Sequence, residues 1–231
     1  MNAKDAKVVF QTPDTKRYEY LITAEQSLLT IKHIHLRELY ELDQNIVKLY
    51  RDPRGQVVGL GVVIPINAHT LGYLLEHPLS SSYFRSLPAS KLEELRVPRY
   101  SQAGWFVKSI DVPSFEDETL RANAGLLFIS YVLSGGYIVA APPAHPIFRD
   151  IHLSIGCEET KDVFHTDYDE KTATPYYVID NRGEKLHEYV TKMISRLGLP
   201  VDPASDQKSV QQESKEAEPL SLLTKREQQI A

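Results

Sequence analysis

The amino-acid sequence predicts a mixed α/β (α+β) protein in which one central sheet is flanked by helices on both faces. Segments with apolar residues at helical spacing alternate with short apolar runs that are typical of strands. Pro, Gly and Asp residues separate these segments, as they do where a chain turns. The 231 residues are 42% hydrophobic and 25% charged, the ordinary composition of a globular chain with one principal domain.

The first elements are expected to be a helix and a hairpin. Residues 23–42 carry apolar side chains at three- and four-residue spacing, which predicts an amphipathic helix. A Pro-Arg-Gly turn then joins strands expected over 46–51 and 56–64. Gly59 and Gly61 within the second strand either mark a β-bulge or let another group pack closely on the sheet.

The remaining elements are expected where periodic segments meet Gly or Pro boundaries. They are two short helices over 70–76 and 89–95, a strand over 105–112, a central helix over 119–133, a strand over 137–141, a helix over 145–155, the strands of a hairpin over 163–168 and 175–180, and a last helix over 184–197. The apolar stripe of the last helix is a candidate dimer contact, although packing on its own sheet is the commoner arrangement.

Charge and composition exclude several classes of function. The formal net charge is −5, whereas proteins that coat nucleic acid are usually basic. The chain shows neither a signal peptide nor an apolar stretch long enough to cross a membrane, so we expect a cytoplasmic protein without membrane contact. Cys157 is the only cysteine and is expected to be buried, and no His-x-x-x-His spacing suggests a metal site.

The order of elements resembles the GNAT N-acyltransferase fold. The resemblance is carried by the hairpin 52–59, the strand 105–112 with the helix 119–133 that follows it, and the segment 148–158, and it covers roughly residues 20–180. It implies a GNAT-like sheet and, for an active member, N-acyl transfer from acetyl- or acyl-coenzyme A. Acyl-homoserine-lactone synthases are similar in their sheet and also have a long segment between the third and fourth strands.

The resemblance also implies a site for coenzyme A at the start of the central helix, where unpaired amides and the helix dipole favour an anion. The candidate binding residues are Val107, Arg121, Asn123 and Gly125. The match to the family's Gly-containing motif is incomplete, and the carboxylates of residues 116–118 crowd the expected pyrophosphate position. Since like charges repel, we expect no cofactor, with acetyl- or acyl-coenzyme A as the alternative.

Catalytic and ligand-binding candidates follow from the same resemblance. Asp111, near the end of a strand, is the candidate base, and Tyr168 or Tyr176 is the candidate acid. The alternative for Asp111 is that it caps the strand end. A small-molecule pocket is expected to be lined by the four residues Gly59, Gly61, Trp105 and Phe106, although these aromatic side chains are equally suited to complete the core.

The last nine residues, 223–231, resemble the opening of a LuxR-type helix-turn-helix domain. Their pattern is Leu-Thr-x-Arg-Glu-x-x-Ile-Ala, and Thr224 and Glu227 have the spacing of a capping box. The resemblance implies that Thr224, Lys225 and Arg226 belong to the start of a DNA-binding domain whose recognition helix is absent. DNA would therefore be bound only by the full-length protein.

We therefore expect a GNAT-like sensory domain over 1–197, a flexible acidic linker over 198–219 and the start of a truncated helix-turn-helix domain over 220–231. The predicted function is the ligand-sensing or dimerising part of a homodimeric LuxR-family transcription regulator without catalytic activity. The alternative is an N-acyltransferase that uses acetyl- or acyl-coenzyme A. A protein-interaction domain without a small ligand is a third interpretation.

Overall fold

The computed structural model describes residues 36–51, 57–112, 117–168, 170–196 and 198. The chain forms two compact units, Met1–Glu188 and Tyr189–Ala231, and the whole sheet belongs to the first. Within the described part of the chain, no helix combines the length and apolar character needed to cross a bilayer.

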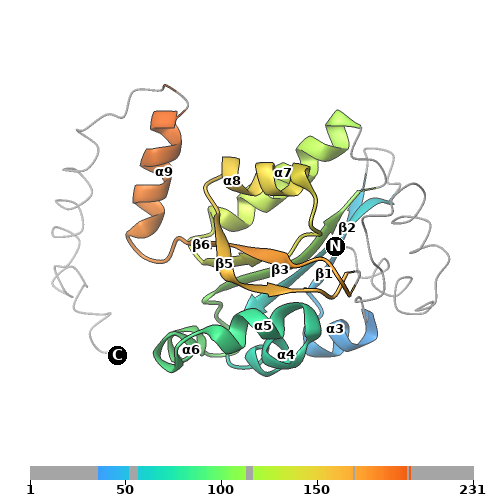
Figure 1. Ribbon diagram of the computed structural model, residues 1–231, viewed down its shortest axis with the longest axis vertical. Helices are drawn as coiled ribbons and strands as arrows, with labels where there is room; N and C mark the ends of the chain where they lie inside the picture. Colours follow the sequence, from blue (N-terminus) through green and yellow to red (C-terminus); the bar gives the residue numbers. More distant parts are fainter. Residues whose placement is uncertain (1–35, 52–56, 113–116, 169, 197, 199–231) are drawn as a thin grey trace, which may run out of the picture. The chain divides into compact units, whose positions relative to one another are not determined.

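The first unit is built on a six-stranded mixed sheet (Figure 1). Its strands are β1 (Val47–Arg51), β2 (Val57–Ile66), β3 (Gly104–Asp111), β4 (Tyr137–Ala140), β5 (Glu158–His165) and β6 (Thr174–Asp180). They lie side by side in the order β1-β2-β3-β4-β6-β5, and of the strand pairs described only β3 and β4 run parallel. This arrangement confirms the predicted mixed sheet and the GNAT-like α/β fold.

Helices cover both faces of the sheet (Figure 1). One face carries α3 (Leu36–Leu42), α4 (Leu71–Glu76), α5 (Pro78–Ser86) and α6 (Ala89–Leu95), and the other carries α7 (Glu118–Val132) and α8 (Pro146–Ser154). α7 is the crossover that joins the parallel strands β3 and β4, as such a connection requires. The last helix, α9 (Lys185–Arg196), begins in the first unit and ends in the second.

Side chains of β3 alternate between the two faces and so contribute to two cores. Phe106 is fully buried and contacts Phe84 of α5, whereas Trp105 contacts Tyr131 of α7 on the opposite face. The larger core lies under α3–α6 and includes Leu39, Leu60, Ile64, Leu71, Leu74, Leu79, Phe84, Phe106, Val139 and Tyr176.

The structure corrects two predicted boundaries. The segment between β2 and β3 holds three helices, because Pro78 occupies the first turn of α5, where a missing N–H costs nothing. β5 starts at Glu158 and not at residue 163. The prediction missed its first half because the charged residues there lack the apolar pattern of a strand. The predicted helix 23–42 is a helix over its described part, Leu36–Leu42.

Beside Gly59, Val58 has no partner on β1, so this site is a bulge.

The outer strand β5 pairs irregularly with β6. Its register jumps between Glu159 and Phe164, which pair with Tyr177 and Pro175 respectively. The intervening residues include the exposed Lys161 and Asp162. β5 is therefore a bulged and charged edge of the sheet.

The parallel pair begins at a close approach of two backbones. A Cβ atom built on Gly104 would lie 1.9 Å from the carbonyl oxygen of Tyr137, and one on Gly136 would lie 2.8 Å from the Cα of Gly104. Both distances are shorter than carbon contacts allow, so only glycine fits at these two positions. Gly104 and Gly136 thereby let β3 and β4 start side by side.

We predict that Gly104→Ala destabilises the protein by about 3–5 kcal/mol, because the added methyl group meets backbone atoms that cannot rotate away. The matched control is Gly125→Ala in α7, where a Cβ would meet nothing within 4 Å. Alanine there should stabilise the helix by up to about 1 kcal/mol. Urea unfolding of both variants measures the difference, and a Gly104→Ala variant as stable as the wild type would contradict the close approach.

Candidate functional site

The site of interest lies where the parallel strands β3 and β4 separate. Their residues pair from Gly104–Tyr137 to Val107–Ala140, and one further bond runs from the Ala141 N–H to the Val107 carbonyl at 3.4 Å. Beyond it, no backbone hydrogen bond between described residues joins β3 to the chain after Ala141. The far half of β3 therefore has one edge paired with β2 and one edge open.

The sequence explains why the strands separate here. Pro142 and Pro143 follow Ala141 directly, and proline has no N–H to continue a ladder. Tyr168 fixes the end of β4, because its hydroxyl donates a hydrogen bond of 2.6 Å to the Ala141 carbonyl. Ala141 is thus held from two sides at the point of separation.

A bulge in β3 places a lysine at the same point. Val62 of β2 pairs with Ser109 and Val63 pairs with Val107, so Lys108 has no partner residue on β2. Lys108 is only 2% exposed, which is rare for a lysine. Its Nζ lies 3.0 Å from Nε2 of His77, which is itself 8% exposed at the junction of α4 and α5.

Burial governs the protonation of Lys108. Removal from water disfavours the ammonium form and lowers the pKa of Lys108 to about 7, although the negative charge of Glu38 acts in the opposite direction. A lysine with such a pKa is largely uncharged in mildly alkaline solution. Uncharged lysines can accept protons or act as nucleophiles, which a surface lysine does poorly at neutral pH.

We predict that Lys108→Met raises the stability at pH 7 by about 2 kcal/mol. In the unfolded chain Lys108 takes up a proton below its ordinary pKa of about 10.4, whereas in the folded protein it does so only near 7. Wild-type stability should therefore rise from pH 7 to 10, and Lys108→Met should lack this rise. Urea unfolding at both pH values measures the effect, with the exposed Lys161→Met as control, and a Lys108→Met variant less stable than wild type at pH 7 would contradict it.

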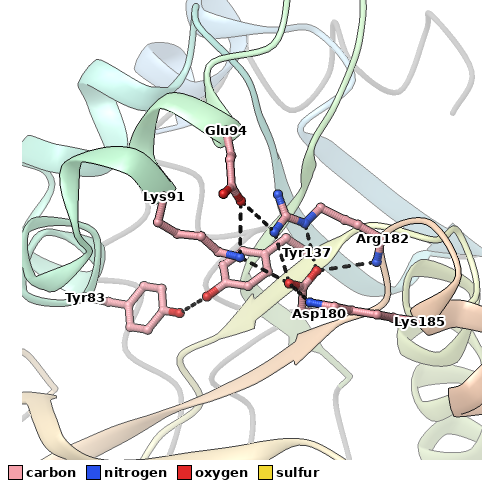
Figure 2. Close-up of polar contacts among 7 residues, drawn as sticks. All are labelled: Tyr83, Lys91, Glu94, Tyr137, Asp180, Arg182 and Lys185. Carbon is pink, nitrogen blue, oxygen red and sulfur yellow. Dashed lines mark hydrogen bonds and ion pairs between the residues drawn. The ribbon is translucent and has the colours of Figure 1, made fainter.

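A second polar cluster lies at the opposite end of β4 (Figure 2). Asp180, at the end of β6, accepts hydrogen bonds from Arg182 Nε at 2.7 Å, Lys185 Nζ at 2.8 Å and Lys91 Nζ at 3.1 Å. Lys91 and Arg182 also lie over the ring of Tyr137, 4.8 Å and 5.3 Å from its centre. The cluster connects α6, β4, β6 and the start of α9.

This cluster is built for stability. Burial alone would raise the pKa of Asp180, but the hydrogen bonds from Arg182, Lys185 and Lys91 outweigh it and hold the pKa well below its ordinary value. Glu94 completes the cluster with ion pairs to Arg182 at 3.1 Å and Lys91 at 3.5 Å. With every charged group paired, the cluster offers little to a substrate.

We predict that Asp180→Asn costs about 1–2 kcal/mol at pH 7, because three cations lose the carboxylate that they surround. Since the folded pKa of Asp180 lies below the unfolded value of about 3.9, its contribution is present above pH 4 and is lost as the pH falls further. The variant should lack this acid-dependent loss. Urea unfolding at pH 7 and pH 3 tests this against the exposed control Asp162→Asn, and equal stability of Asp180→Asn and wild type at pH 7 would contradict it.

The structure brings some of the predicted catalytic and cofactor residues to the strand separation. Val107 and Tyr168 both lie there and contact Ala141. Asp111 is the last residue of β3, and its side chain lies outside the described part of the structure. Tyr176 is buried in the core under α3–α6, in contact with Tyr83 and His165.

The predicted coenzyme A residues 121, 123 and 125 all lie on α7. Asn123 is exposed, Gly125 lies within the helix, and Arg121 pairs with Glu118 at 3.9 Å. The carboxylate of Asp117 accepts the Thr119 N–H at 2.9 Å, so a negative charge already occupies an amide at the helix start.

The four predicted pocket residues do not line one common space. Gly59 and Gly61 are buried in β2 and pair with Tyr50 and Lys48 of β1. Trp105 and Phe106 contact helices on opposite faces of the sheet, as described above. Phe106 is a core residue, and the indole N–H of Trp105 donates to Ser134.

Several predictions stay outside what the structure tests. Thr224, Lys225 and Arg226 lie outside the described residues, as do residues 199–219 of the predicted linker 198–219. The helix-turn-helix interpretation, DNA binding and the homodimer therefore stay predictions. Among the described residues, no three His, Cys, Asp or Glu side chains are grouped as a metal site would need. Cys157 is buried, and burial raises the pKa of its thiol to about 12.

Sequence reasoning missed Lys108 and His77. The available signal was a single charged side chain, that of lysine, inside the mainly apolar run Trp-Phe-Val-Lys-Ser-Ile of a predicted strand. The partner could not be found in the same way, because His77 is 31 residues away and meets Lys108 only through the packing of α4 and α5 on the sheet.

No protein-family model and no curated protein matches the chain. Solved structures that are similar in the course of the backbone include two acetyltransferases. The polyamine N-acetyltransferase of Drosophila melanogaster, which catalyses the formation of N-acetylagmatine, is 13% identical, with 74% of this chain and 96% of that chain covered and a TM-score of 0.43. A histone acetyltransferase HPA2 and related acetyltransferase from Corynebacterium glutamicum is 12% identical, with 79% and 94% covered and a TM-score of 0.41.

At these identities no residue role is carried over from either protein. Both are nevertheless named as acetyltransferases, and this finding contradicts the expectation that the chain uses no cofactor.

Proposed function

We propose that the chain transfers an acyl group from an acyl-coenzyme A to an amine, with the donor's pantetheine arm along the open edge of β3. The observation that carries the proposal is the separation of β3 from β4 after Val107 and Ala141. Because the backbone of residues 109–111 is paired with β2 on one side only, its other edge can pair with an extended ligand.

The residues at this edge fit the arm of coenzyme A. Pantetheine is extended and carries two amides, which match the backbone donors and acceptors that a strand edge presents. Ser109 adds a buried hydroxyl that has no hydrogen-bond partner among the described residues. A buried polar atom of this kind is costly unless it is satisfied, and a bound amide would satisfy it.

The described start of α7 does not fit the pyrophosphate of the same donor. The Asp117 carboxylate already accepts from the first turn, and the exposed Glu118 adds a second negative charge. Both would repel a phosphate group. The pantetheine arm and the acyl end therefore lie at the open edge of β3, and α7 takes no part in binding the pyrophosphate.

When bound, coenzyme A supplies an activated acyl group as a thioester. The chain's own contribution is to hold that group beside the strand separation. Tyr168 keeps the Ala141 carbonyl in place, and the buried Val107 and Val112 exclude water along this part of β3. Lys108 supplies a titratable amine at the bulge.

We predict that acetyl-coenzyme A and S-acetylpantetheine bind with dissociation constants within about tenfold of each other, since the phosphates gain little from α7. Calorimetric titration measures both, and Asp180→Asn, altered at the other end of β4, should bind as the wild type does. Absence of binding for both donors at millimolar concentration would overturn the proposal.

Glu118→Gln provides a further test. Removing this exposed charge should tighten acetyl-coenzyme A binding by up to about fivefold and leave S-acetylpantetheine unchanged, because only the former carries the pyrophosphate. Equal changes for both donors would show that the donor's phosphates do not lie near α7.

A further inference from the structure

His77 connects the N-terminus of α5 to the bulge of β3. Its Nδ1 accepts a hydrogen bond from the Leu79 N–H at 3.2 Å and thereby caps α5. Its Nε2 lies 3.0 Å from Lys108 Nζ. One imidazole ring therefore takes part in two hydrogen bonds, one at each nitrogen.

The cap determines which nitrogen of His77 carries the proton. A ring nitrogen that accepts a hydrogen bond has none, so a neutral imidazole bonded in this way is protonated at Nε2. The Nε2–H then points at Lys108 Nζ. An ammonium group has no lone pair and would set donor against donor, whereas an uncharged amine accepts the bond.

We propose that His77 is a positioning residue that holds Lys108 as an uncharged amine, and that Lys108 is the base that takes the proton of the acceptor amine. The second part rests on the proposed acyl transfer.

The groups around the pair support an uncharged Lys108. Burial lowers the pKa of Lys108 towards neutrality, against the influence of Glu38 on α3. Tyr73 of α4 contacts the His77 ring at 5.1 Å, and burial raises the pKa of Tyr73 well above its ordinary value, so it stays neutral. Among the described residues, Glu38 is thus the charged group that acts on Lys108, and it is exposed on α3.

The proton transfer balances as follows. The nitrogen of the acceptor amine bonds to the acyl carbon while the carbon–sulfur bond breaks and its electron pair leaves on sulfur. The proton that this nitrogen loses goes to the lone pair of Lys108 Nζ, which becomes an ammonium and returns the proton to solvent. His77 opposes a lasting charge on Lys108, because its Nε2–H cannot accept from the ammonium.

The first test is nuclear magnetic resonance on the unliganded full chain, with 15N-labelled histidine and 13C-labelled lysine. We expect His77 to show a protonated Nε2 and an unprotonated Nδ1, and Lys108 to titrate near neutral pH. A protonated Nδ1, or a Lys108 that is still an ammonium at pH 8.5, would overturn the proposal without reference to any activity.

A matched variant separates the cap from the contact with Lys108. His77→Asn keeps a side-chain acceptor for the Leu79 N–H, since asparagine is a good N-cap residue, but has no group in place of Nε2. We expect the Lys108 titration to move to higher pH by at least one unit, equivalent to a tenfold change in its proton affinity. An unchanged titration in a folded variant would remove His77 from the proposal.

Activity then tests the role of Lys108 as the base. Acetyl transfer from acetyl-coenzyme A to an amine such as agmatine should rise with pH through the measured Lys108 titration, and in His77→Asn this profile should shift with it. Lys108→Met should lower kcat by about a hundredfold or more with little change in KM. An unaltered kcat would exclude Lys108 as the base, whereas failure of acetyl-coenzyme A to bind at all would overturn the proposed function and leave the tautomer result intact.

Discussion

The pairing of β3 with β4 is the constraint on which the rest of the structure depends. It begins where Gly104 and Gly136 allow two backbones to approach closely, and it ends at the proline pair after Ala141. A parallel ladder of four residue pairs is too short to hold a sheet alone, so packing of α5 and α7 on opposite faces must hold it. The same shortness leaves the far half of β3 with an open edge in the middle of a sheet.

The two ends of β4 illustrate two ways of placing ionisable groups. At its start, Asp180 is charged and pairs with cations at the surface, so the arrangement stabilises the fold near neutral pH. Near its other end, Lys108 is buried against the ring of His77 and forms no ion pair with a described residue. A stable fold does not need a lysine there, and a destabilising buried group is commoner at functional sites than elsewhere.

The sequence allowed the sheet and most helices to be predicted, because burial on one or two faces leaves a periodic signal in strands such as β4 and helices such as α7. It failed at α5, where Pro78 looks like a boundary but occupies a first helical turn. Of the candidate site residues, Val107 and Tyr168 lie at the strand separation. Trp105 and Phe106 do not share a pocket, because neighbouring residues in a strand face opposite sides. His77 and Lys108 could not be paired from sequence, since only tertiary packing brings them together.

The irregular outer strand β5 affects how this protein behaves in concentrated solution. A straight strand with free N–H and C=O groups at the rim of a sheet can recruit the same strand of another molecule and start a fibre. Here the register jump between Glu159 and Phe164 breaks the straight run of donors and acceptors, and Lys161 and Asp162 would have to be dehydrated for such pairing. β5 thus opposes growth of the sheet at this edge by addition of further molecules.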